Sequence, residues 1–136
     1  LKMLNINFEG NRSITRRIDF TSASYRTIKD NFLFGVGFNN FTVFVDKYNY
    51  DSPDLRFLQP VHNIFLLIFS ESGIFGFLLF ISLIGFSLKR LINSSYFHVF
   101  LISLLQIVLL GSFDHYLFTI HQTLLLFWII FGLSLQ

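Results

Sequence analysis

A long apolar segment constrains the fold of this sequence more than any other feature. No Asp, Glu, Lys or Arg occurs between Gly73 and Leu88, and Lys89 and Arg90 follow directly. A helix over this segment would be about 24 Å long, which covers most of a bilayer core of about 30 Å. The segment therefore predicts a membrane span that ends at a pair of positive charges.

The other charged residues are distributed unevenly along the chain. Residues 1–60 hold 14 of the 18 Asp, Glu, Lys and Arg residues, although the whole chain is 53% hydrophobic. This composition is too apolar for an ordinary soluble domain, and the net charge of +2 is too small and too dispersed for a nucleic-acid partner. We predict an all-α, multispanning helical membrane protein with a polar N-terminal region.

Three membrane spans are predicted within residues 61–136. After Arg90, Asp114 is the only Asp, Glu, Lys or Arg residue, and it divides two further apolar runs. The spans cover about residues 73–88, 95–113 and 116–135. Residues 61–72, which precede the break at Gly73, are predicted to form a helix at the membrane boundary.

The positive-inside rule orients these spans. It places Lys89 and Arg90 in the cytoplasm, so residues 1–60 form a large, partly helical extracytoplasmic loop region. Because the chain begins at Leu1 and shows no signal-like segment, we expect it to be the C-terminal fragment of a longer multispanning protein.

A helix is predicted over about residues 13–30, with Ser13 as its N-cap. Its buried face is expected where apolar positions recur at helical spacing, at Ile14, Ile18, Thr21, Tyr25 and Ile28. Arg17 edges this stripe, whereas Arg16 is turned by about 100° towards Phe20. Arg17 is therefore the arginine expected to face inward. The alternative is that both arginines are solvated or bind lipid phosphate.

Glycines mark a turn after this helix. Gly35 and Gly37 permit backbone angles that other residues rarely adopt, but the Gly-Val-Gly sequence lacks the spacing of a nucleotide-binding loop. Residues 42–58 are predicted to be a solvated loop. Its Asp51 and Asp54 have no neighbouring His or Cys, so no metal site is predicted there.

Two histidine-containing pairs border the predicted spans. Pro60 suits the first turn of a helix, which predicts His62 and Asn63 within that turn. Asp114 and His115 form the predicted turn between the second and third spans. Without further information, His62 is more simply interpreted as a capping or core residue than as a catalytic one.

The order of these features resembles the O-antigen ligase and polymerase family of bacterial membrane glycosyltransferases, over about residues 13–136. In Asn31–Gly37, Phe32 stands where the family usually has Pro, and Arg16 beside Arg17 leaves the register of the arginine open by one position. The resemblance rests on Arg17, Asn31–Gly37, His62-Asn63, Glu71-Ser72-Gly73 and a tail from Phe113 to Trp128.

The resemblance implies transfer of a glycan from a polyprenyl-diphosphate-linked oligosaccharide to an acceptor hydroxyl on a glycan or lipid. The site would lie on the extracytoplasmic face of the bacterial cytoplasmic membrane and would use no metal and no other cofactor. Arg17 would clamp the diphosphate and His62 would act as general base. The expected substrate-binding residues are Arg16, Gly35, Gly37, Asn63, Asp114 and His115.

A different class of protein is the alternative. The chain would then be a fragment of a multispanning transporter or polysaccharide exporter, with Asp114 and His115 on a translocation or proton path.

Overall fold

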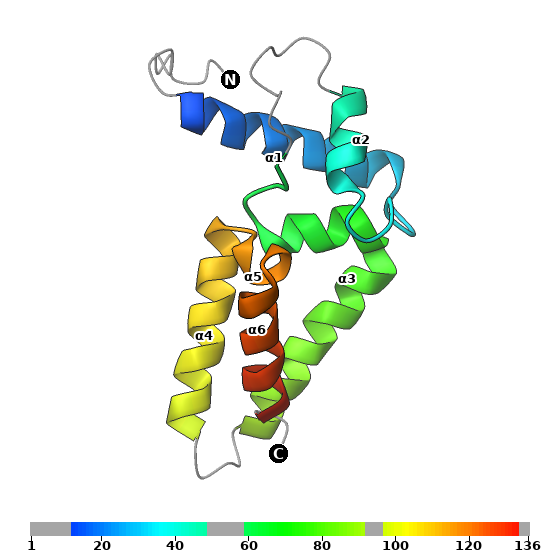
Figure 1. Cartoon of the computed structure of the whole chain (residues 1–136). Coiled ribbons are helices and arrows are strands. Elements are labelled where there is room, and N and C mark those ends of the chain that lie inside the picture. Colours follow the sequence, from blue (N-terminus) through cyan, green and yellow to red (C-terminus); the bar gives the residue numbers. More distant parts are fainter. Residues whose placement is uncertain (1–11, 49–58, 92–96, 134–136) are drawn as a thin grey trace, which may run out of the picture.

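The computed structural model describes residues 12–48, 59–91 and 97–133, and all regular elements in these ranges are helices, which confirms the all-α prediction (Figure 1). The helices are α1 Arg12–Asp30, α2 Phe41–Tyr48, α3 Ile64–Leu91, α4 Phe97–Phe113, α5 Tyr116–Thr119 and α6 His121–Leu133. The loop predicted at residues 42–58 begins as helix α2. Its Asp51 and Asp54 lie outside the described residues.

Helix α1 lies across the top of the molecule, and its buried face differs from the predicted one (Figure 1). The exposed fractions of Ile18 and Tyr25 are 52% and 61%, so the predicted stripe faces outward. The buried residues are Phe20, Ala23, Ser24 and Thr27. Three of these side chains are small, which allows α1 to pack closely. The hydroxyls of Ser24 and Thr27 donate to carbonyl groups of α1 itself, so their burial leaves no donor unpaired. The helix begins at Arg12, which precedes the predicted N-cap, Ser13.

Helix α3 changes direction at Gly73, where φ is 67° and ψ is −168°. The first segment, residues 64–72, lies across the end of the other helices, and the second runs down beside α4 and α6 (Figure 1). We call residues 64–72 the crossing helix. Such a positive φ is readily adopted by glycine and costs other residues about 1–2 kcal/mol. The break that the sequence predicts at Gly73 is thus a sharp bend at which two helical segments meet.

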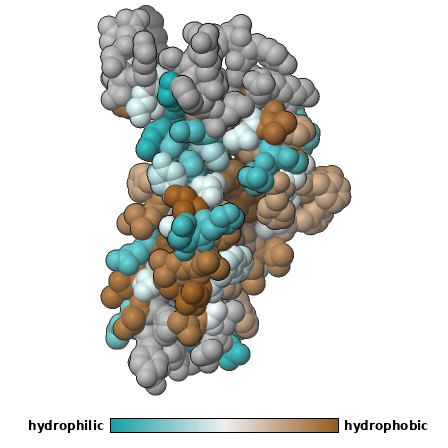
Figure 2. Space-filling model, viewed as in Figure 1, coloured by the Kyte–Doolittle hydropathy of each residue, from teal (hydrophilic) through white to brown (hydrophobic). Residues whose placement is uncertain are grey.

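Three apolar helices form a bundle below the crossing helix. Figure 2 shows hydrophobic side chains over this part of the molecule and hydrophilic ones above it. One helix in the described part of the chain, Ile64–Arg90, is long and apolar enough to cross a membrane, and Phe97–Phe113 and His121–Leu133 are shorter apolar helices. The third predicted span, residues 116–135, is not one continuous helix, because Ile120 is extended between α5 and α6.

Two clusters of buried side chains hold these parts together. The upper one joins α1, α2 and the crossing helix through Phe20, Ala23, Phe41, Val45, Val61 and Leu67. The lower one joins α3, α4 and α6 through Ile64, Ile68, Phe80, Ile107, Phe127 and Phe131. Both clusters contain residues of the crossing helix, which is therefore the element that connects the polar and apolar parts of the molecule.

Candidate functional site

Asn63 begins the crossing helix and fixes the position of His62. Its side-chain Oδ1 accepts hydrogen bonds from the backbone N–H groups of Phe65 (2.9 Å) and Leu66 (3.0 Å), as an N-cap does. Its Nδ2 donates to the carbonyl oxygen of Ser112 at the end of α4 (2.9 Å). The Asn63 side chain is thus engaged in structural hydrogen bonds, and its substrate-binding role stays a prediction. The first helical residue is Ile64, so His62 lies just before the helix and not in its first turn.

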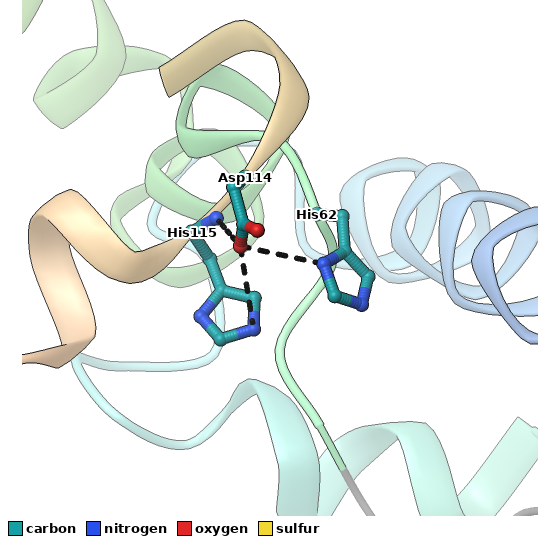
Figure 3. Close-up of side chains that lie close together, drawn as sticks. All are labelled: His62, Asp114 and His115. Carbon is teal, nitrogen blue, oxygen red and sulfur yellow. Dashed lines mark hydrogen bonds and ion pairs between the residues drawn. The ribbon is translucent and has the colours of Figure 1, made fainter. Parts of the chain in front are cut away.

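His62 meets Asp114 although the two residues are 52 positions apart. His62 Nδ1 lies 3.4 Å from Asp114 Oδ1, and the same oxygen accepts a hydrogen bond from the backbone N–H of His115 (2.7 Å) (Figure 3). The rings of His62 and His115 are 5.0 Å apart between centroids. We call these three residues the His-Asp-His cluster. It joins the segment before the crossing helix to the turn between α4 and α5.

His115 is the buried member of this cluster, with an exposed fraction of 5%. Its Nδ1 lies 2.8 Å from the hydroxyl of Thr119, which itself donates to the His115 carbonyl oxygen. The Nδ1–H group is then the donor to Thr119, and Nε2 carries a lone pair. Burial lowers the pKa of His115, and the positive charge of Arg17 lowers it further, whereas Asp114 raises it. The side chain of His115 is buried, and its substrate-binding role stays a prediction.

Arg17 reaches the same turn from α1. Its Nη1 is 3.5 Å from the carbonyl oxygen of Phe113, the residue before Asp114, and its side chain is exposed. Arg16 is half-buried on the Phe20 side of α1, and its Nε has no hydrogen-bond partner among the described residues. The expectation that Arg17 is the inward-facing arginine is therefore wrong. Arg17 instead presents its charge beside the His-Asp-His cluster, where a ligand has access to it.

Gly35 and Gly37 lie at the other end of the crossing helix. The Gly35 N–H donates to the Asn31 carbonyl (2.8 Å), and the Gly37 N–H donates to the Glu71 carbonyl (2.8 Å). The Val36 N–H donates to the carbonyl of Ser70 (3.0 Å). The Val36 and Gly37 amides satisfy carbonyl groups at the C-terminal end of the crossing helix, and the Gly35 amide closes the turn after α1. The substrate-binding role of Gly35 and Gly37 stays a prediction.

Sequence reasoning missed two contributions to this region. Thr119 contacts Nδ1 of His115 and orients its ring. The sequence held a signal for this contact, because residues four positions apart are neighbours on a helix. Glu71 accepts a hydrogen bond from the Phe41 N–H (3.3 Å) at the start of α2. It also borders a cavity of about 470 Å³ that includes Thr119 and Trp128. Contacts across 30 positions, as between Glu71 and Phe41, leave no periodic trace in a sequence.

The arrangement provides a hydrogen-bonded carboxylate and imidazole beside a permanent positive charge. The cluster also contains possible metal ligands, because one ligand atom from each of His62, Asp114 and His115 lies within 4.8 Å of the others. A carboxylate that accepts a hydrogen bond from Nδ1–H leaves the Nε2 lone pair of an imidazole available for a proton. Proton abstraction beside a bound anion is thus the chemistry that these residues support.

Comparison with known proteins gives one match. The family model for O-antigen ligase matches residues 1–81, more than half of the 136-residue chain. The matched segment contains α1, α2, His62 and the bend at Gly73, and it ends before Asp114 and His115. No curated protein and no solved structure matches the chain.

Proposed function

Because the chain belongs to the O-antigen ligase family, we propose that it transfers a glycan from a polyprenyl-diphosphate-linked oligosaccharide to an acceptor hydroxyl. Membership of this family implies an enzyme of polysaccharide biosynthesis that acts at a membrane. The donor, the acceptor on a glycan or lipid, and the extracytoplasmic face of a bacterial cytoplasmic membrane belong to the proposal. One observation carries it: His62 is paired with Asp114 within reach of Arg17.

His62 is the general base in this proposal. Its Nδ1–H donates to Asp114, which leaves the Nε2 lone pair to take the proton of the acceptor hydroxyl. The hydroxyl oxygen forms a bond to the anomeric carbon of the donor while the bond from that carbon to the diphosphate oxygen breaks. Asp114 stabilises the imidazolium that forms. A separation of 3.4 Å is long for this hydrogen bond, and such contacts shorten when substrate is bound.

Arg17 stabilises the leaving group. A guanidinium forms two parallel hydrogen bonds with a phosphate and keeps its charge at any physiological pH. In this role Arg17 neutralises the charge that develops on the diphosphate, so the reaction needs no divalent metal. The long contact with the Phe113 carbonyl, 3.5 Å, is weak enough to be exchanged for a phosphate oxygen. The half-buried Arg16 adds a second positive charge on the same turn of α1.

The proposed membrane arrangement places this site at the outer surface. The second segment of α3, α4 and α6 are the three crossings in this proposal, and many of their large apolar side chains are exposed, as lipid contact requires. Lys89 and Arg90 follow at the far end of the α3 span, where the positive-inside rule puts the cytoplasm. The His-Asp-His cluster lies at the opposite end of the bundle, beside the polar α1.

The proposal is tested with the full-length protein reconstituted in liposomes. Polyprenyl-diphosphate-linked oligosaccharide is supplied in the presence of EDTA, and formation of longer or newly linked glycans is followed on gels. We expect transfer by the wild-type protein and by His98→Ala, whose histidine is exposed and remote from the cluster. Transfer that requires added magnesium or manganese would contradict the metal-independent mechanism. Movement of the labelled donor across the membrane without a new glycosidic bond would favour the exporter alternative.

A further inference from the structure

We infer that the His-Asp-His cluster also binds a zinc ion and that this ion inhibits glycan transfer. The inhibitory effect rests on the function proposed above, whereas the binding of the metal does not. Two imidazoles and one carboxylate form a common ligand set for zinc, with the fourth position left to water. In this chain the set comes from the segment before the crossing helix and from the α4–α5 turn.

The distances within the cluster suit a single ion. Ligand atoms held about 2.0–2.1 Å from zinc lie about 3.3 Å apart in a tetrahedron. His62 Nδ1 and Asp114 Oδ1 are 3.4 Å apart, which is already close to this value. His115 Nε2 is 4.0 Å from the same oxygen, and the three ligand atoms lie within 4.8 Å of one another. Rotation of side chains is therefore enough to complete the site.

His115 supplies independent evidence that this cluster can bind a ligand. Its Nε2 is buried and has no hydrogen-bond partner among the described residues, a costly arrangement for a polar atom. The Nδ1–H group is held by the Thr119 hydroxyl at 2.8 Å, which directs the Nε2 lone pair towards Asp114. Histidines that bind metals are commonly oriented in this way, by a hydrogen bond from the other ring nitrogen.

His62 cannot bind zinc and act as the general base at the same time. In the proposed mechanism Nδ1 carries the ring proton and Nε2 accepts the proton of the acceptor hydroxyl. Zinc at Nδ1 needs the lone pair there, so the ring proton moves to Nε2 and the imidazole stays neutral. His62 then has no lone pair for the acceptor hydroxyl. Asp114 is also withdrawn from His62 when its carboxylate binds the ion.

Metal binding is measured directly on the full-length protein, purified through a tag without histidine and stripped with EDTA. Cobalt(II) is the probe, because tetrahedral Co²⁺ has strong visible absorption and zinc displaces it. We expect one tightly bound Co²⁺ in the wild-type protein and in the control His98→Ala. His62→Ala and His115→Ala should lower the affinity by more than about tenfold, and Thr119→Val by about tenfold, since it removes only the orienting hydrogen bond.

Zinc inhibition is measured in the same preparations with the lipid-linked donor. We expect the zinc concentration for half-inhibition to rise at least about tenfold in Thr119→Val relative to wild type, in parallel with its Co²⁺ affinity. His115→Gln keeps most of the side-chain volume and serves if His115→Ala does not fold. Absence of tetrahedral Co²⁺ absorption in the wild-type protein, or equal affinity in the folded His115 variants, overturns the metal site. Co²⁺ binding by a protein that transfers no glycan overturns the proposed function and leaves the metal site standing.

Discussion

The two ends of the crossing helix, residues 64–72, use their polar groups in opposite ways. At the C-terminal end, the amides of Gly35, Val36 and Gly37 all donate to backbone carbonyl groups. At the N-terminal end, His115 Nε2 has no hydrogen-bond partner among the described residues, and His62 and Asp114 remain partly exposed. Amides paired with backbone carbonyl groups indicate a structural joint, whereas the proposed catalytic site rests on the polar groups at the N-terminal end.

The two ends also differ in how they tolerate change. The turn at Gly35 packs so closely against the bend at Gly73 that an added Cβ at either glycine would overlap backbone atoms of the other segment. The side-chain contacts within the His-Asp-His cluster are longer, at 3.4 Å between His62 Nδ1 and Asp114 Oδ1 and 4.0 Å between His115 Nε2 and Asp114 Oδ1. We therefore expect substitutions at Gly35 or Gly73 to lower the stability of the fold. Substitutions in the His-Asp-His cluster should lower the rate of glycan transfer.

The largest effect is expected for His62→Ala. Removal of a general base should lower kcat by about 1,000-fold, within the usual range of 10²–10⁴ for such groups, while the donor still binds. The measurement is turnover beside the dissociation constant of a polyprenyl diphosphate donor. His121→Ala removes an exposed histidine outside the cluster and is the matched control. A loss of donor affinity in His62→Ala would assign this residue to binding instead.

Gly35→Ala tests the structural role of the turn that packs against Gly73. The positive φ of 66° and the overlap with the Glu71 backbone predict a loss of about 3 kcal/mol in the free energy of unfolding. Gly85→Ala is the control, because a Cβ there meets no described atom within 4 Å. Thermal unfolding in detergent measures both. Near-normal stability of Gly35→Ala combined with lost transfer would show that the glycine turn belongs to the catalytic site.

Arg17→Lys tests whether Arg17 binds the diphosphate through two parallel hydrogen bonds of its planar guanidinium group. Lysine keeps the charge but loses the two parallel hydrogen bonds, so kcat/KM should fall by about 100-fold, nearly as much as in Arg17→Ala. Donor affinity should fall in both variants. Arg26→Lys changes an exposed arginine elsewhere on α1 and should leave transfer unchanged. Unchanged donor affinity in Arg17→Ala would remove this residue from the diphosphate site.

The smallest effect is expected for Asp114→Asn. Its carboxylate is partly exposed and lies 3.4 Å from His62, so water screens its charge and the loss in kcat should be about tenfold. Turnover of Asp114→Asn beside that of the wild-type protein measures this loss. If Asp114→Asn abolishes transfer as completely as His62→Ala in a folded protein, Asp114 is the better candidate for the general base.

Much of the fold follows from local patterns in the sequence. The apolar run after Gly73, the helical character of residues 13–30 and the turn at Gly35 depend on residues within a few positions of each other. The same locality explains the errors. Periodicity favoured the face of α1 that carries Ile18 and Tyr25, which is exposed, because the buried face is decided by the residues that pack against Phe20. The predicted third span is interrupted at Ile120, whose backbone is extended between α5 and α6.

The sequence by itself determined which residues could do chemistry, and the tertiary structure decided which of them lie close together. The order of Arg17, His62 and Glu71-Ser72-Gly73 was enough to indicate the family. Only the folded chain brings Arg17 to the turn after α4, across 96 positions, and His62 to Asp114, across 52. Such contacts are set by the packing of α1 and the crossing helix on the bundle. Propensity and periodicity act over one or two turns of helix and carry no information about partners at that distance.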